Sequence, residues 1–336
     1  MLATLMTATA AAPRNDHDER VRRDYRCVPL DIVRLYHDLG VCLYTKAEDQ
    51  DFPRLYRSSR IAITDDDVNE LRRRGHRWFY VPVSEYAALD QEVKRTLRDK
   101  LCDQSVAPEE RFAVLQTAAA VELDSAFHMI KCERFVDLSR SIAKDINALF
   151  GDDAIAPRRL FDLVQHDFYT FTHATNVAGF ATLLADGVGL SDSASREQIA
   201  LGALLHDIGK RFIPARVLNK SGKLSDEEWG QIRMHPQRGY EDLCEGAGLS
   251  EGQLMMVYSH HERIDGQGYP VGMVGDEIHP WAKLLAVVDV FDAITGARPY
   301  RAPMKIGQAL AFLERNAGAH LDPDMVQCWI ALMNKT

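Results

Sequence analysis

Apolar residues recur at helical spacing through the second half of the chain. Three segments there are almost continuously apolar, at Ile199–Leu205, Leu254–Tyr258 and Leu284–Ile294. Such segments are typical of helices buried inside a domain, whereas a surface helix keeps one polar face. The pattern predicts an all-α domain over residues 157–336.

A mixed pattern precedes this domain, over residues 27–101. Thr64 is placed to cap a helix that runs to Arg74 with Gly75 behind it, and Ser84 is placed to cap another. Short β-branched and aromatic segments favour strands, because such side chains suit a half-buried pleated surface. The strands expected are Val41–Tyr44, Leu55–Tyr56, Ile61–Ile63 and Trp78–Val81. We therefore expect a small α+β module with a regulatory role, in a chain that is mainly α.

Residues 102–156 join these two regions. The helical spacing of apolar residues from Pro108 to Phe150 predicts long linking helices, the candidate surface for a homodimer or for a signalling partner protein. Residues 1–26 begin mildly apolar and turn charged from Arg14 to Arg23. Because no basic segment precedes the apolar one, this start predicts a disordered tail and not a signal peptide.

Composition narrows the class of protein. A hydrophobic fraction of 46% and a charged fraction of 26% are those of a globular protein, and the net charge of -9 argues against a DNA- or RNA-binding protein. The six cysteines form no CxxC pair, which favours reduced thiols in the cytoplasm. No window approaches 18 consecutive apolar residues, so no membrane association is expected.

A charged pair closes the first apolar segment. His206 and Asp207 follow Leu205, and Lys210 lies one helical turn beyond His206. Burial of ionisable groups is costly unless they pair or bind a metal. The pair alone favours a buried histidine hydrogen-bonded to an aspartate, and Lys210 shifts the balance toward a functional site.

Further potential metal ligands lie on other expected helices. His260 and His261 follow the second apolar segment, and adjacent helical residues point about 100° apart, so each imidazole can serve a different ion. Asp289 lies within the third apolar segment and needs a buried partner. His173 and His235 lie on two more expected helices. Together these imidazoles and carboxylates predict a pair of divalent metals, which in enzymes mainly serve to split phosphate esters.

The spacing of these residues resembles the HD-GYP domain, a subgroup of the HD phosphohydrolases. The resemblance rests on the HDIGK residues 206–210 and the HHERIDGQGYP residues 260–270, and covers roughly Phe161–Met333. It implies hydrolysis of cyclic di-GMP to pGpG, and in some members onward to GMP. It also implies two divalent ions, iron or manganese foremost, with nickel, zinc and magnesium as further candidates. The implied ligands are His173, His206, Asp207, His235, His260, His261 and Asp289.

The resemblance implies further roles around these ligands. Asp207 would bridge the metals, and Lys210 would contact the scissile phosphate, so these two are the expected catalytic residues. Arg298 and Arg301 match positions that contact the nucleotide, with solvated arginines at a helix end as the alternative. Tyr269 either stacks on the substrate or packs its own loop, and packing is favoured.

One position departs from part of the family. Some members carry a glutamate four residues before the first histidine, where it helps to hold a third metal, and Tyr169 occupies that position here. We therefore expect a two-metal site, and the resemblance implies that members without this acid are slower and often stop at pGpG. Two other functions stay open: a cyclic di-GMP sensor with little turnover that signals through its helices, and a hydrolase of another cyclic dinucleotide such as cyclic GMP-AMP.

Overall fold

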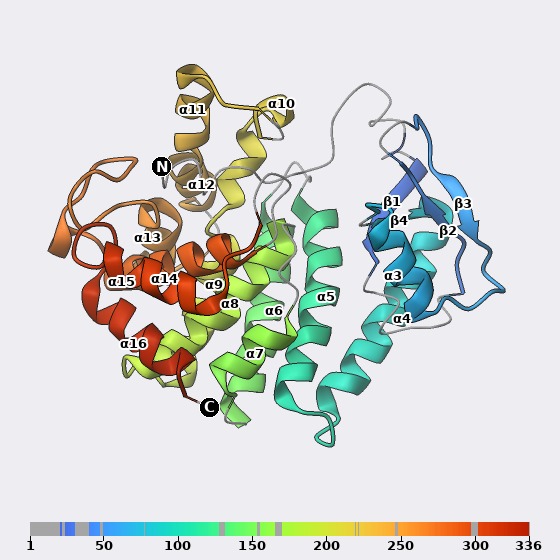
Figure 1. The fold of residues 1–336 in the computed structure, drawn as a ribbon, viewed down its shortest axis with the longest axis horizontal. Helices are drawn as coiled ribbons and strands as arrows, with labels where there is room; N and C mark the ends of the chain where they lie inside the picture. Colours follow the sequence, from blue (N-terminus) through green and yellow to red (C-terminus); the bar gives the residue numbers. More distant parts are fainter. Residues whose placement is uncertain are drawn as a thin grey trace.

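The structure is a computed structural model that describes residues 21, 24–30, 40–47, 50–76, 78–127, 132–152, 155–164, 170–218, 220, 222–245, 248–296 and 302–335. Helices dominate it, and a small antiparallel sheet lies at one side (Figure 1). The expected fold class, mainly α with an N-terminal α+β part, is confirmed. None of the described helices has the length and apolar character needed to cross a bilayer.

Four strands form the N-terminal sheet, in the order β1-β4-β2-β3 with every pairing antiparallel. One helix follows β3 and a long helix follows β4. The Thr64 hydroxyl accepts from the Asp67 N–H at 3.3 Å, as expected of the first residue of a helix cap. The elements are β1 (Tyr25–Pro29), β2 (Leu43–Thr45), β3 (Arg54–Arg57), α3 (Asp65–Arg73), β4 (Trp78–Pro82) and α4 (Val83–Cys102).

Two expectations for this region were wrong. Ile61–Ile63 is not a strand: Ile61 is 52% exposed and only Ile63 is buried, in the irregular segment that leads into α3. Conversely, the sequence reasoning missed β1, whose first two residues fall in the expected tail 1–26. Residues 1–20 of that tail lie outside the described residues.

Most helices from α5 onward share one hydrophobic core, whereas Val217 of α10 and Ile232 of α11 form a smaller cluster with Ile213. Phe180, Phe291 and Trp329 meet in the centre of the shared core, with ring centroids 5.3–6.0 Å apart. The elements are α5 (Pro108–Phe127), α6 (Glu133–Asp152), α7 (Pro157–Leu163), α8 (Thr170–Gly187), α9 (Ser193–Leu205), η1 (Ile208–Phe212), α10 (Ala215–Leu218), α11 (Asp226–Arg233), α12 (His235–Leu243), α13 (Glu251–Ser259), η2 (Gly275–Glu277), α14 (Pro280–Thr295), α15 (Ile306–Asn316) and α16 (Pro323–Met333).

The linking helices α5 and α6 pack inside the chain. Phe112, Leu115 and Leu123 of α5 and Ile146 of α6 are buried in the C-terminal core. Their apolar faces are therefore used within the protein itself. The homodimer expected through residues 108–150, and the domain boundaries at 26, 101 and 156, stay predictions.

Candidate metal centre

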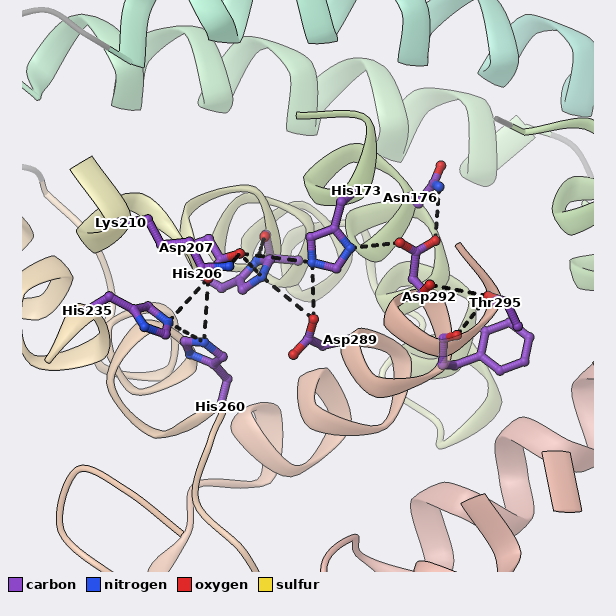
Figure 2. Close-up of polar contacts among 12 residues, drawn as sticks. His173, Asn176, His206, Asp207, Lys210, His235, His260, Asp289, Asp292 and Thr295 are labelled. Atoms are coloured by element: carbon purple, nitrogen blue, oxygen red, sulfur yellow. Dashed lines mark hydrogen bonds and ion pairs between the residues drawn. The ribbon is translucent and has the colours of Figure 1, made fainter. Parts of the chain in front are cut away.

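Five helices converge on one buried cluster of imidazoles and carboxylates (Figure 2). His173 lies in α8 and Asp289 in the middle of α14, whereas His206 ends α9, His235 begins α12 and His260 ends α13. Asp207 and His261 directly follow two of these. All seven residues expected as metal ligands are thus brought together, and each is at most 8% exposed.

Backbone carbonyl groups at the helix ends fix how three of the imidazoles are turned. The Nδ1–H of His206 donates to the Ala203 carbonyl at 2.6 Å, and that of His235 donates to the Ile232 carbonyl at 2.8 Å. His260 Nδ1 bonds in the same way to the Val257 carbonyl at 3.0 Å. A carbonyl can only accept, so the proton sits on Nδ1 and the Nε2 lone pair faces the cluster.

Asp207 lies between two sets of these nitrogens. Its Oδ1 is 3.3 Å from His235 Nε2 and 3.9 Å from His260 Nε2. Its Oδ2 is 3.3 Å from His206 Nε2 and 4.0 Å from His173 Nε2, and it accepts from Lys210 Nζ at 2.5 Å. The two oxygens of this carboxylate thus face different imidazoles, one pair on each side.

The two halves each contain three potential ligands within 4.8 Å of one another. One is His173, His206 and Asp289; the other is His235, His260 and His261. Oxygen and nitrogen donors without thiolates suit divalent iron, manganese, nickel or zinc.

Two features of the cluster favour bound cations over hydrogen bonds among its own side chains. Among the described residues, the buried Nε2 of His206 has no hydrogen-bond partner. His235 Nε2 and His260 Nε2 face each other at 3.2 Å, although both protons are held at Nδ1. Opposed lone pairs in a buried site are unfavourable unless a cation lies beside them.

The pKa shifts of His260, His261 and Asp207 agree with this interpretation. Burial lowers the pKa of His260 to about 3 and holds the pKa of His261 well below its ordinary value, so both imidazoles stay neutral and can bind a metal. Burial alone raises the pKa of Asp207, but Lys210 and His206 outweigh it and hold that pKa well below the usual range. The carboxylate is therefore ionised at neutral pH.

A close backbone contact at Gly209 holds η1, which follows His206 and Asp207, against α12, which begins at His235. A β-carbon on Gly209 would lie 1.8 Å from the His235 carbonyl oxygen, closer than any side chain allows. Glycine therefore lets η1 and α12 approach each other. This contact brings the Asp207 carboxylate within 3.3 Å of His235 Nε2.

The loop after the histidine pair is held by Glu262, whose role the sequence reasoning missed. Its buried carboxylate accepts from the N–H groups of Val271, Gly272 and Met273 at 2.7–3.1 Å. At the turn itself, a β-carbon on Gly268 would lie 2.5 Å from the Glu262 Cα. The signal was an acidic residue next to two histidines, but its backbone partners could not be inferred from spacing.

Tyr269 lies over the second ligand set. Its ring centroid lies 4.7 Å from that of His261, with 33° between the ring planes, and the Arg233 guanidinium carbon lies 6.0 Å from the Tyr269 ring centroid. The half-buried ring packs against a ligand, and the choice between loop packing and a substrate contact stays a prediction. Arg298, Arg301 and Tyr169 lie outside the described residues.

Asp292 is a second residue that sequence reasoning missed. Its Oδ2 accepts from the Nδ1–H of His173 at 2.7 Å, and its Oδ1 accepts from the Asn176 amide at 3.0 Å (Figure 2). It lies one helical turn after Asp289, so the signal was a second buried acid on the same apolar helix. Asp292 orients His173 toward the centre.

Comparison with known proteins agrees with this geometry. The HD domain family model matches residues 158–325. A cyclic di-GMP phosphodiesterase of Pseudomonas aeruginosa is 34% identical over 244 residues, 72% of this chain and 55% of that protein. A 3′3′-cGAMP-specific phosphodiesterase of Vibrio cholerae is 39% identical over 166 residues, 49% of this chain and 35% of that protein. The chain thus spans about half or less of the length of these relatives.

A solved structure has the same fold. An HDG"Y"P protein of Bdellovibrio bacteriovorus superposes with a TM-score of 0.74 at 17% identity, covering 93% of this chain and 100% of that one. The match extends over the N-terminal sheet as well as the helices, since it leaves only 7% of the chain uncovered. The chain belongs to the HD-domain family.

Proposed function

We propose that this protein is a metal-dependent phosphodiesterase that hydrolyses cyclic di-GMP to pGpG. The observation that carries the proposal is the position of Asp207 between two sets of imidazole nitrogens, among them the buried Nε2 of His206, which has no hydrogen-bond partner among the described residues. The names of the curated relatives support the substrate class.

Two divalent ions would be held in the cluster. His173, His206 and Asp289 would hold one, His235, His260 and His261 the other, and Asp207 would contact both. When bound, such ions supply a water nucleophile that is ionised near neutral pH and neutralise charge on the phosphoryl oxygens. Iron and manganese fit the donor set best.

The other residues bind and orient the substrate. Lys210 is buried beside Asp207 and can neutralise charge that develops on a phosphoryl group at this point. The half-buried Tyr269 ring lies along the His261 side of the centre, where it limits the space open to a nucleotide. Arg298 and Arg301 stay proposed nucleotide contacts.

The test is turnover by the full chain purified without oxygen. Protein loaded with Mn²⁺ or Fe²⁺ is incubated with cyclic di-GMP, and the products are separated by chromatography. We expect pGpG, its loss after chelation, and its loss in Asp207→Ala. Asp276→Ala, which removes an exposed acid outside the cluster, is the control and keeps full activity. Full metal content and activity in Asp207→Ala would refute the assignment.

The similarity to a 3′3′-cGAMP-specific phosphodiesterase favours a second candidate substrate, cyclic GMP-AMP. Parallel assays with the two dinucleotides at equal concentration decide between them through the ratio of their kcat/KM values. Binding of cyclic di-GMP without turnover, in protein shown to hold its metals, would establish the sensor function instead.

A further inference from the structure

A chain of buried hydrogen bonds leads from the metal centre to helix α5. His173 Nδ1–H donates to Asp292, and the Asn176 amide donates to the other oxygen of Asp292 (Figure 2). The Gln116 amide donates in turn to the Asn176 side-chain oxygen. Asn176 and Gln116 are at most 1% exposed. Gln116 lies on α5, outside the residues that match the HD domain family.

The same helix forms part of the N-terminal core. Ala118 of α5 is buried with Val28, Phe79 and Leu89 of the N-terminal module, and contributes to their hydrophobic cluster. Two residues apart on a helix are about 200° apart, so Ala118 faces the module while Gln116 faces α8. Helix α5 therefore contacts both the module and the hydrogen-bond chain.

The packing between α5 and α8 is tight enough to move the two helices together. A β-carbon on Gly179 of α8 would lie 2.5 Å from the Phe112 ring of α5, so the ring rests directly on the helix backbone. Close-packed interiors transmit displacements because they hold few voids to absorb them. A shift of α5 is therefore passed to the helix that carries His173.

We propose that Gln116 and Asn176 are positioning residues for the ligand His173, and that α5 couples the N-terminal module to the affinity of the metal centre. Asp292 holds the His173 proton at Nδ1, which aims Nε2 at Asp289 and Asp207. Loss of such an outer partner of a ligand typically weakens metal binding by about 10–100-fold. The proposal rests on metal binding by the proposed function, and does not depend on turnover.

The experiment measures Mn²⁺ binding to the full chain by isothermal titration calorimetry. Gln116→Met keeps the side-chain volume and removes the amide. We expect about 5–10-fold weaker binding in Gln116→Met, about 10–100-fold in Asp292→Ala, and no further loss in the double variant, because both changes break one chain. The control is Asn147→Leu, which removes a buried amide that bonds to Ser193 and Arg196 in the same core and leaves Mn²⁺ affinity unchanged.

A second pair of variants tests the link to the module. Ala118→Val crowds the interface between α5 and the N-terminal core. It changes Mn²⁺ affinity at least 3-fold in the otherwise unchanged chain, and by less than 1.5-fold in the Gln116→Met background. If Gln116→Met fails to fold, Gln116→Asn replaces it, since it keeps the amide and shortens its reach.

The outcomes separate this inference from the proposed function. The hydrogen-bond coupling would be overturned if the losses of Mn²⁺ affinity in Gln116→Met and Asp292→Ala added up in the double variant. It would also be overturned if Gln116→Met changed Mn²⁺ affinity no more than the control Asn147→Leu does. Unchanged affinity in Ala118→Val would overturn the link to the module. Wild-type protein that binds Mn²⁺ but does not cleave cyclic dinucleotides contradicts the proposed function alone, whereas protein that binds no Mn²⁺ contradicts both.

Discussion

Replacement of Glu262 by glutamine should release the loop that follows the histidine pair. The carboxylate accepts four hydrogen bonds from three consecutive backbone N–H groups, of Val271, Gly272 and Met273, and is 2% exposed. Glutamine keeps the shape of the side chain but replaces one acceptor oxygen by an NH₂ group that faces backbone donors. The substitution thus changes the charge and the hydrogen-bonding pattern and little else.

The magnitude follows from the contacts that change. Hydrogen bonds to a charged group contribute about 1.5–3 kcal/mol each, and a buried donor left without a partner costs about 1–3 kcal/mol. Glu262→Gln loses the charge behind all of these bonds and, depending on how the amide is turned, leaves either the Val271 or the Met273 N–H without an acceptor. We therefore expect the loop to become about 3–5 kcal/mol easier to open. Each 1.4 kcal/mol is a factor of ten, so the amides of residues 271–273 should exchange their hydrogens at least about 100-fold faster.

Amide hydrogen exchange followed by mass spectrometry measures this directly, with urea unfolding as the global readout. Asp276→Asn is the matched control, because it makes the same change of acid to amide just after residues 271–273, at a fully exposed side chain. Exchange at residues 271–273 should rise only in Glu262→Gln, while Mn²⁺ stays bound and the KM for cyclic dinucleotide rises as Tyr269 loses its support. Unchanged exchange at these three amides would refute the role given to Glu262.

Three further predictions follow from individual contacts. Lys210→Met should lower kcat by about 100-fold or more while the variant retains its metal content. Loss of the metals from the variant protein would show instead that the lysine only supports the ligands. Gly209→Ala should lose metal and stability because its β-carbon would meet the His235 carbonyl at 1.8 Å, whereas Gly222→Ala, with nothing within 4 Å, should match wild type in thermal unfolding. Burial lowers the pKa of His320 to about 4, so the unfolded chain binds more protons between pH 6.5 and 4 and stability falls as the pH drops through that range. His320 should contribute about 2 kcal/mol to the loss of stability between pH 7.5 and 5, and a pH profile that His320→Gln leaves unchanged would contradict this.

The sequence predicts the ligands better than it predicts what holds them. His206 and His260 end apolar helices, and an imidazole next to a carboxylate at such a place is visible in the order of residues alone. The partners of these ligands depend on contacts between helices. Asp292 contacts His173, and Gln116 is linked to Asp292 through Asn176, only because α5, α8 and α14 pack together, and no spacing along the chain encodes that arrangement.

In the N-terminal sheet, too, some strands can be predicted from the sequence and others depend on contacts with a neighbouring strand. The expected strand at Trp78–Val81 is confirmed as β4, since its alternating pattern marks one buried face. The strand β1 was missed because Tyr25–Pro29 has no such pattern and is held by its pairing with β4. Ile61–Ile63 has the composition of a strand but no partner in the described sheet. In both cases the pairing, and not the composition, decides the structure.

The most direct test of the whole account is to count and locate the metal ions in protein purified without oxygen. Elemental analysis should give two divalent ions per chain, and anomalous diffraction should place them on either side of Asp207, within about 4 Å of each other. A single ion per chain, no ion, or ions bound away from His173, His206, His235 and His260 would contradict it.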